Sequence, residues 1–195
     1  KAACQLLQGG AGLGAHLVRD PKIHLIAFTG SREVGLEILR QAYTHSPGQE
    51  HVKRVVCEMG GKNAIIIMDD ADIDNAVEGS LWGAFGTSGQ RCTASSRLVV
   101  HKKVYKKFVQ KLVERVNALR VGPGLDPKTE VGPVIHEDAM QKILGYIEIG
   151  KKVDKATLAA GGNRLTKRDF SKGWYIEPTV FTDVKPGMRI EQEEI

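Results

Sequence analysis

Short apolar runs alternate with amphipathic stretches through the first sixty residues of the chain. Val34, Ile38 and Ala42 recur at helical spacing and give one stretch a single apolar face. The alternation predicts strand, helix, strand, helix and strand at residues 5–7, 13–18, 25–28, 33–43 and 54–57. Strands joined through helices pair in parallel, so this region is expected to form an α/β unit around a parallel sheet.

A second alternating series begins at residue 60 and predicts a second α/β domain. Turn residues mark its later part: Gly161-Gly162 predicts a turn, and Pro178 interrupts an apolar run and places it near a sheet edge. The expected elements are strands at 64–68, 98–100 and 175–181 and helices at 73–85, near 102–120 and at 137–150. The predicted domains are therefore residues 1–59 and 60–195.

Charge and cysteine content exclude several classes of protein. The net charge of +5 comes largely from lysines on one predicted helix, and no aromatic residues are interleaved with them, so a solvated helix face is favoured over a nucleic-acid site. Three cysteines without a CxxC pair indicate a reducing compartment. No apolar run approaches the roughly 20 residues that cross a bilayer, so we expect no membrane association.

Cys92 follows a stretch rich in glycine and hydroxylic residues, Phe85-Gly-Thr-Ser-Gly-Gln-Arg-Cys92. Such a backbone turns tightly and leaves a thiol accessible, with amides and a cation nearby that favour the thiolate. Glu58 ends another apolar run beside a glycine turn, where it is a catalytic base, a solvated strand end or an ion-pair partner. A thiol and a carboxylate predict covalent catalysis on a carbonyl, whereas Cys4 and Cys57 are expected to be small buried hydrophobes.

Two glycine turns are candidates for binding a dinucleotide. The segment from Gly10 to Ala15 fits G-x-G-x-x-A, but the next strand lacks the acidic residue expected to bind the ribose. Gly30 and Ser31 precede a predicted helix, whose N-terminus would favour a phosphate. Ser31 is equally well explained as an ordinary helix N-cap.

The sequence does not indicate a metal site. Asp70, Asp72 and Asp74 imitate the start of a calcium loop, but Asn75 and Leu81 stand where the loop needs glycine and glutamate. The six histidines show no ligand spacing that would suit zinc.

Four motifs in order resemble the aldehyde dehydrogenase superfamily: Phe28-Thr-Gly-Ser31, Glu58-Met-Gly-Gly-Lys62, Gly89-Gln-Arg-Cys92 and Glu191-Gln-Glu-Glu-Ile195. Residues 47–54 and 146–150 look more like the 1-pyrroline-5-carboxylate dehydrogenase branch than the general branch. The resemblance implies an α/β aldehyde dehydrogenase-like fold. The chain would comprise the end of a Rossmann-like NAD-binding domain, residues 1–59, and much of an α/β catalytic domain, residues 60–195.

The resemblance also implies roles for individual residues. Cys92 would attack an aldehyde, its backbone N–H would hold the oxyanion, and Glu58 would activate the water that hydrolyses the resulting thioester. Phe85 and Thr93 would bind the substrate, with the Thr93 hydroxyl receiving a substrate carboxylate. The residues expected to bind the cofactor are Gly30, Ser31, Met59 and Glu194.

The implied substrate is glutamate γ-semialdehyde, which would be oxidised to glutamate in proline breakdown. Cys92-Thr93 also resembles enzymes acting on α-ketoglutaric semialdehyde, so that substrate and a general aldehyde remain alternatives. NAD is expected, with NADP an open alternative. A non-catalytic structural or assembly protein is the alternative of another class. Arg91 replaces a lysine expected before the cysteine, without an assigned consequence.

The ends suggest a piece of a longer protein, since the chain starts at Lys1 and stops inside a segment resembling Glu-Glu-Ile-Phe-Gly-Pro. The family's second oxyanion donor, an asparagine, would lie upstream, so the isolated piece is expected to be inactive. The intact protein is expected to be a homo-oligomer in the cytoplasm, or in the mitochondrial matrix of a eukaryote.

Overall fold

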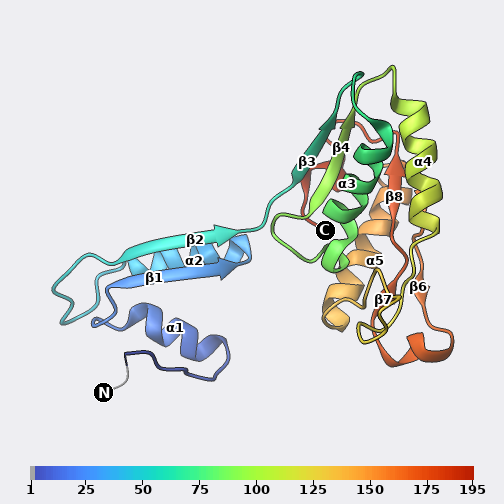
Figure 1. The fold of residues 1–195 in the computed structure, drawn as a ribbon. Coiled ribbons are helices and arrows are strands. Elements are labelled where there is room, and N and C mark those ends of the chain that lie inside the picture. The colour runs from blue at the N-terminus through green and yellow to red at the C-terminus, as the bar shows by residue number, and fades with distance from the viewer. Residues whose placement is uncertain (1–2) are drawn as a thin grey trace. The chain divides into compact units, whose positions relative to one another are not determined.

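The computed structural model describes residues 3–195 and has a mixed α/β fold containing parallel strand pairs (Figure 1). Its contacts divide the chain into two compact units, Lys1–Gly60 and Gly61–Ile195. Each unit is described below by itself.

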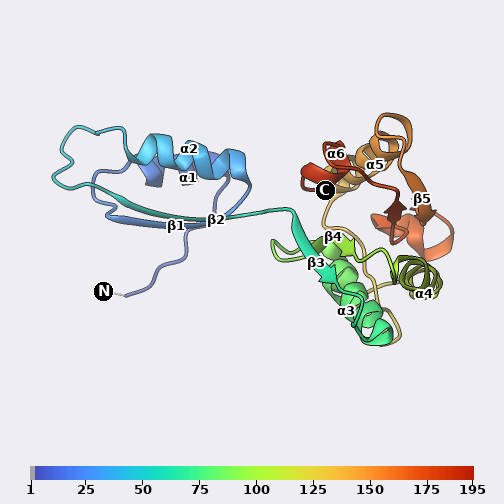
Figure 2. The same cartoon turned by 90° about the horizontal axis from the view of Figure 1, so that it is seen from above.

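The first unit is a two-stranded parallel sheet with two helices. Its elements are α1 (Ala11–Arg19), β1 (Leu25–Gly30), α2 (Arg32–Ala42) and β2 (Arg54–Met59). The register pairs Leu25 with Arg54 and Gly30 with Met59, so both strands end at the same edge. Helix α2 lies along one side of the strands (Figure 2). The two strands and the helix between them confirm the parallel α/β arrangement expected from the alternating pattern.

The expected strand at residues 5–7 is wrong. Residues 4–10 have no regular secondary structure, and Leu6 and Leu7 are 85% and 58% exposed. A strand exists only through hydrogen bonds to a neighbouring strand, and in the part of the chain described here β1 pairs only with β2. The Gly10–Ala15 turn therefore follows an irregular segment, and Gly10 is the N-cap of α1.

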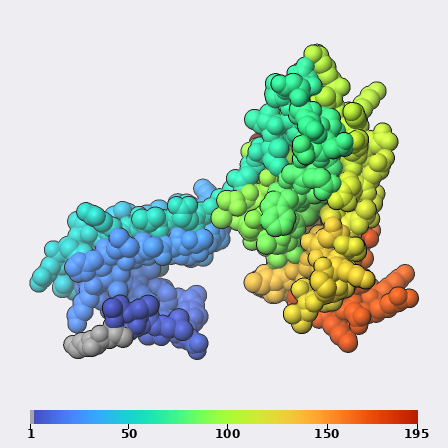
Figure 3. All heavy atoms as spheres, in the orientation of Figure 1, coloured from blue at the N-terminus to red at the C-terminus, as the bar shows by residue number. Residues whose placement is uncertain are grey.

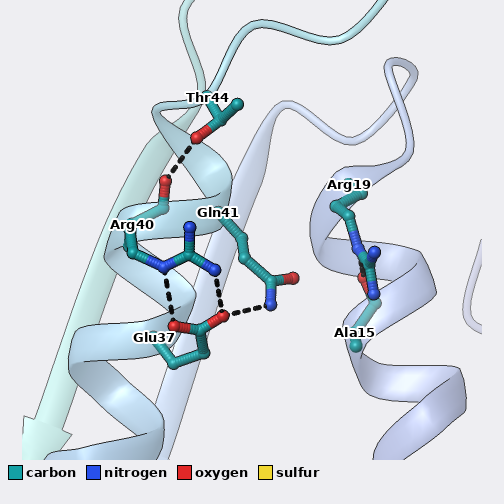
Figure 4. Close-up of polar contacts among 6 residues, drawn as sticks. All are labelled: Ala15, Arg19, Glu37, Arg40, Gln41 and Thr44. Carbon is teal, nitrogen blue, oxygen red and sulfur yellow. Dashed lines mark hydrogen bonds and ion pairs between the residues drawn. The ribbon is translucent and has the colours of Figure 1, made fainter.

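Helix α2 carries a hydrogen-bonded cluster around Glu37 (Figure 4). Arg40 donates two hydrogen bonds to the Glu37 carboxylate, at 2.8 and 2.6 Å, and Gln41 donates one at 2.5 Å. The bond from Arg40 and then that from Gln41 lower the pKa of Glu37 to about 2. These groups are one turn apart, so the cluster stabilises the helix surface locally.

Lys53 is almost fully buried in the first unit, with 2% of its surface exposed. Its Nζ donates a hydrogen bond to the carbonyl oxygen of Val18 at 2.5 Å. A cation beside the last carbonyls of α1 is favoured by the helix dipole. This contact ties the residue before β2 to the C-terminal end of α1.

The second unit begins with another parallel pair joined through a helix. Its first elements are β3 (Asn63–Ile67), α3 (Ile73–Phe85), β4 (Ser95–Val100) and α4 (Tyr105–Asn117). Helices α3 and α4 bury apolar side chains against β3, and the cluster includes Ile67, Val77, Leu81, Phe108 and Leu112. The predicted helix at 73–85 is confirmed, and the predicted strands at 64–68 and 98–100 lie close to their observed positions.

Acidic groups on and before α3 face basic groups on and before α4. Lys103 pairs with Asp69 at 2.6 Å, Arg115 pairs with Glu78 at 2.6 Å, and Lys111 pairs with Asp74. The two helices lie against each other in the space-filling view, where they are green and yellow-green (Figure 3). Part of the lysine-rich helix therefore complements a neighbouring acidic helix within the same unit.

The remainder of the second unit is built from short antiparallel pairs around α5. Strand β5 pairs with β8, and β6 pairs with β7. The elements are α5 (Glu137–Lys152), β5 (Thr157–Ala160), β6 (Arg164–Leu165), β7 (Tyr175–Ile176), β8 (Val180–Thr182) and α6 (Arg189–Gln192). Met140 and Ile147 of α5 form a second buried cluster with Val134 and Ile176.

Pro178 divides the expected strand at 175–181 into β7 and β8, which belong to different pairs. Proline has no N–H to give to a strand ladder, so the run cannot continue through this position. The turn predicted at Gly161 and Gly162 is confirmed, with φ values of 68° and 99°. A Cβ at Gly161 would lie 2.1 Å from the Pro178 carbonyl oxygen, so this turn requires glycine.

Over residues 3–195, none of the helices combines the length and the apolar character needed to cross a membrane.

Candidate active site

Four of the predicted site residues meet at the carboxyl edge of the first unit's sheet. Gly30 ends β1 and Ser31 follows it, while the parallel register places Glu58 opposite Thr29 and Met59 opposite Gly30. Ligands of parallel α/β sheets bind outside the carboxyl ends of the strands. The structure therefore gathers Gly30, Ser31, Glu58 and Met59 where such a ligand would be bound.

Ser31 is the N-cap of α2. Its Oγ accepts a hydrogen bond from the Val34 N–H at 3.3 Å, and its backbone is extended, as in an ordinary N-cap. Ser31, Arg32 and Glu33 are exposed, so the first turn of α2 is open to solvent. An anionic group fits this position, since the first amides of a helix have no partners within the helix.

Met59 and Glu58 project to opposite sides of β2. Met59 is half-buried and faces α2. Its sulfur is so close to Gly35 of that helix that a Cβ at position 35 would lie only 2.6 Å from it. Cys57, on the same side, has its Sγ 3.8 Å from the Gly35 carbonyl oxygen. Glu58 is exposed on the other side. Among residues 3–195, its carboxylate has neither a hydrogen-bond donor nor an ion-pair partner.

The loop that carries Cys92 has an unusual backbone. After α3, Thr87, Ser88 and Gly89 have φ values of 54°, 57° and 67°, which places three consecutive residues in the left-handed region. Thr87 and Ser88 have a side chain that disfavours this conformation, at a cost on the order of 1 kcal/mol each. A Cβ at Gly89 would lie 2.8 Å from the carbonyl oxygen of Ala84, so only glycine fits there.

Three side-chain hydrogen bonds from distant parts of the chain hold this loop. Ser88 Oγ donates to the Gly132 carbonyl oxygen at 3.0 Å, and Gln90 Oε1 accepts from the Ile135 N–H at 2.8 Å. Asn63 Nδ2 donates to the carbonyl oxygen of Cys92 at 2.7 Å. Tertiary contacts therefore hold the loop in addition to its local sequence, in which Gly89 is required.

Cys92 lies in a turn just before β4, and it is an exposed free cysteine. The neighbouring Arg91 places its guanidinium 5.6 Å from the centre of the Trp82 ring, a cation–π contact. Thr93 is exposed beside Cys92, so its hydroxyl is accessible. Phe85, at the end of α3, is half-buried and packs against the core between α3 and α4, so part of its ring has a packing role.

Glu194 lies in an acidic segment that follows α6. Arg97 of β4 pairs with Glu191 at 2.9 Å, and the Arg97 guanidinium also donates to the Lys62 carbonyl oxygen at 2.5 Å. Burial lowers the pKa of Lys62 to about 8 and Arg97 acts in the same direction, while Glu191, Glu194 and Glu193 oppose the shift. The ammonium of Lys62 is thus in the field of Glu194, which is itself exposed.

Glu193 anchors the same acidic segment to α5 and α6. It accepts a hydrogen bond from Tyr146 Oη at 2.6 Å and pairs with Arg189 at 2.9 Å. The bond from Arg189 and then that from Tyr146 lower the pKa of Glu193 to about 2. Asp154 accepts from the amides of Arg189 and Ile190 at 3.2 and 2.9 Å, so it caps the start of α6.

The predicted site residues thus fall into two groups. Gly30, Ser31, Glu58 and Met59 share one sheet edge in the first unit, and Phe85, Cys92, Thr93 and Glu194 belong to the second unit. No cluster of three or more His, Cys, Asp or Glu side chains suited to a metal occurs among residues 3–195.

Sequence reasoning missed Asn63 and Arg97. An asparagine directly after Gly60-Gly61-Lys62, at the start of a strand, was a usable signal for Asn63 because a polar side chain there can reach the neighbouring loop. No local signal marked Arg97, whose partner Glu191 is far away in sequence.

Comparison with known proteins identifies a family and several relatives. A model of the aldehyde dehydrogenase family matches residues 1–195. A 1-pyrroline-5-carboxylate dehydrogenase from Bacillus subtilis is 47% identical over 186 residues, covering 95% of this chain and 35% of the relative. A second enzyme of that name, from Halalkalibacterium halodurans, is 45% identical with the same coverage.

Solved structures agree in fold. A 1-pyrroline-5-carboxylate dehydrogenase from Thermus with bound NAD superposes with a TM-score of 0.87 at 44% identity, covering 93% of this chain and 34% of that one. A betaine aldehyde dehydrogenase from Staphylococcus aureus gives 0.89 at 39% identity, covering 97% and 36%. The chain therefore spans about a third of the length of the proteins it matches. It belongs to the aldehyde dehydrogenase family.

Proposed function

We propose that the protein oxidises an aldehyde to a carboxylate with NAD, and that the aldehyde is glutamate γ-semialdehyde. The observation that carries the proposal is the exposed Cys92 thiol on a loop held by distant side chains. A nucleophile must be both accessible and fixed in place, and this loop meets both needs. The identity of 47% to a 1-pyrroline-5-carboxylate dehydrogenase supports the choice of substrate.

Cys92 would act as the nucleophile in its thiolate form. Its sulfur would form a bond to the aldehyde carbon, and the carbonyl oxygen would become an oxyanion held in part by the Cys92 backbone N–H. Loss of hydride from that carbon would leave a thioester on Cys92. Glu58, exposed and without a described partner in residues 3–195, would take a proton from water as the water attacks the thioester. The carboxylate product would leave and the thiolate would be restored.

The turn after β1 would hold the cofactor. Gly30 allows the backbone to be approached closely, and the first turn of α2, with Ser31 at its start, suits a pyrophosphate. When bound, NAD would supply the hydride acceptor. Met59 lies beside Gly30 in the sheet register, and Glu194 is the candidate for binding a ribose hydroxyl pair. NADP remains the alternative.

Thr93 and Phe85 would contact the substrate. The exposed Thr93 hydroxyl can donate to a carboxylate on the aldehyde, which would distinguish a semialdehyde from a neutral aldehyde. The second candidate function is the oxidation of another aldehyde that need not carry a carboxylate. The similarity to a betaine aldehyde dehydrogenase, with a TM-score of 0.89, supports this alternative. α-Ketoglutaric semialdehyde is included in the test because, like glutamate γ-semialdehyde, it carries a carboxylate.

The proposal is tested on the protein in its natural length. NADH formation is measured with 1-pyrroline-5-carboxylate, α-ketoglutaric semialdehyde and a neutral aldehyde, for the wild type and for Cys92→Ala. Preference for the first substrate, with a loss of at least about 10³-fold in Cys92→Ala, is expected. Cys57→Ala is the matched cysteine control and should retain turnover. Equal turnover of all three aldehydes would contradict the substrate, and undiminished turnover in Cys92→Ala would contradict the mechanism.

A further inference from the structure

The side chain of Asn63 binds the backbone that carries Cys92. Its Nδ2 donates to the carbonyl oxygen of Cys92 at 2.7 Å and to that of Ala94 at 3.1 Å. An amide nitrogen has two hydrogens, so it can satisfy both acceptors. One half-buried side chain at the start of β3 thus holds two carbonyls on either side of Thr93.

The regular strand pairing does not hold this segment. Strands β3 and β4 pair in parallel, but the register shifts at the first step: Asn63 pairs with Ser95, whereas Ala64 pairs with Arg97. Residues 92–94 precede β4 and lie outside that ladder. Asn63 therefore supplies, through its side chain, hydrogen bonds that strand pairing does not supply here.

The other two anchors of the loop act on the opposite side of Cys92. Ser88 and Gln90 precede the cysteine and bind Gly132 and Ile135. On the other side, the Asn63 side chain binds the carbonyl oxygens of Cys92 and Ala94. A backbone hydrogen bond from the Ala94 N–H to the Arg91 carbonyl oxygen, at 3.0 Å, also closes the turn at Cys92 and Thr93. Without the Asn63 bonds, the carbonyl of Cys92 would lose its side-chain donor, and the peptide between Cys92 and Thr93 would be less firmly held within this turn.

We propose that Asn63 is a positioning residue that fixes the Cys92–Thr93 peptide and thereby aims the Cys92 thiol at the bound aldehyde. This inference rests on the proposed role of Cys92 as the nucleophile. Asn63 acts through the backbone and does not contact the substrate. Because reaction rates depend steeply on the alignment of the reacting atoms, a small displacement of the loop is enough to slow the attack.

Three substitutions at Asn63 form a graded test in the protein of natural length. Asn63→Ser keeps one donor and should cause the smallest loss of kcat. Asn63→Ala removes both hydrogen bonds and should lower kcat roughly tenfold. Asn63→Asp has the same shape but presents a carboxylate to two carbonyl oxygens, and it should lower kcat about a hundredfold. The KM for NAD should stay within about twofold in all three.

The matched control is Asn163→Ser in the same unit. Asn163 also donates a side-chain hydrogen bond, to Glu177 at 2.9 Å, but between β6 and β7 rather than on the Cys92 loop. Its substitution should leave kcat unchanged. Circular dichroism spectra of all variants establish that each is folded.

A second readout separates positioning from turnover. Iodoacetamide labelling of Cys92 is followed by peptide mass spectrometry, which distinguishes it from Cys4 and Cys57. The order of labelling rates should follow the order of kcat, and Asn163→Ser should label like the wild type. Wild-type kcat and wild-type Cys92 labelling in a folded Asn63→Asp would overturn the proposal.

The two proposals fail in different ways. If the wild type oxidises no aldehyde, the proposed function fails, while the labelling rates of Cys92 still report whether Asn63 holds the loop. If the wild type is active and the Asn63 variants match it in kcat and labelling, the function stands and the positioning role fails.

Discussion

Single side chains at the ends of helices give this molecule much of its local order. Ser31 and Asp72 both cap helices, Ser31 through the Val34 N–H and Asp72 through the N–H groups of Asp74 and Asn75 at 3.0 Å. The Ser31 cap was predicted from the sequence as a short polar residue before an apolar-periodic stretch, whereas Asp72 was considered as part of the rejected calcium loop and not as a cap. What the sequence could not decide was whether Ser31 has any role beyond capping.

Substitutions of Ser31 separate its two roles. Ser31→Ala should lower the free energy of unfolding of the first unit by about 1 kcal/mol, because the Val34 N–H loses its acceptor. Ser31→Asp should preserve that stability, since aspartate also caps helices, but should weaken NAD binding by repelling the pyrophosphate. Denaturant titration and the KM for NAD measure the two effects. An unchanged KM in Ser31→Asp would contradict a cofactor role.

At the scale of elements, hydrophobic burial holds the second unit together. Phe108 of α4 has 0% of its surface exposed and packs within the cluster formed with α3 and β3. The ion pairs that join α3, α4 and the residues before them are exposed to solvent, and such pairs contribute little. The buried face, rather than the charged one, should therefore determine how firmly the helices are held.

Paired substitutions on α4 test this view. Phe108→Ala should lower the free energy of unfolding of the second unit by about 3 to 5 kcal/mol, because it removes buried apolar surface and leaves a cavity. Arg115→Ala, which removes the solvent-exposed ion pair with Glu78 on the charged face of the same helix, should change it by less than about 1 kcal/mol. Denaturant titration compares the two. Similar losses for both would mean that the charged face carries the stability.

The elements could be predicted to different degrees. Helix α3 and strands β1, β2 and β3 were close to prediction because periodicity and apolar runs are local signals. Strands β5 and β6 were not predicted, and one strand was predicted in place of β7 and β8, because strands of two to four residues depend on distant partners. The segment 5–7 failed for the same reason, since its apolar pattern found no strand to pair with.

At the scale of the whole molecule, contacts between residues far apart in the sequence hold the parts of the candidate site in place. The candidate site residues could be chosen from motifs, and the register of β1 and β2 then places four of them at one edge. The anchors Asn63, Ser88 and Gln90 bind partners 29 to 45 residues away, so the local sequence does not identify those partners. Distant residues also hold α6 and the acidic segment after it: Arg97 and Asp154 bind residues of α6, and Tyr146 binds Glu193.

The acidic segment should make the second unit sensitive to acid. The pKa of Glu193 is lowered from 4.5 to about 2, so its carboxylate stabilises the folded state above pH 4.5 and loses that effect as the pH falls toward about 2. Glu193→Gln should therefore be less stable than the wild type near neutral pH, and the two should converge toward pH 2. Denaturant titration across this range measures the difference, and a gap that does not narrow would contradict it.

The left-handed run of Thr87, Ser88 and Gly89 also limits how this protein can evolve. Asparagine, aspartate and glycine are the residues that adopt that backbone most readily. Substitution of Thr87 or Ser88 by most other residues should therefore destabilise the loop. Position 89 has no such freedom, since any Cβ would meet the carbonyl oxygen of Ala84. Lineages that descend from this sequence should therefore vary around the Cys92 loop far more easily than within it.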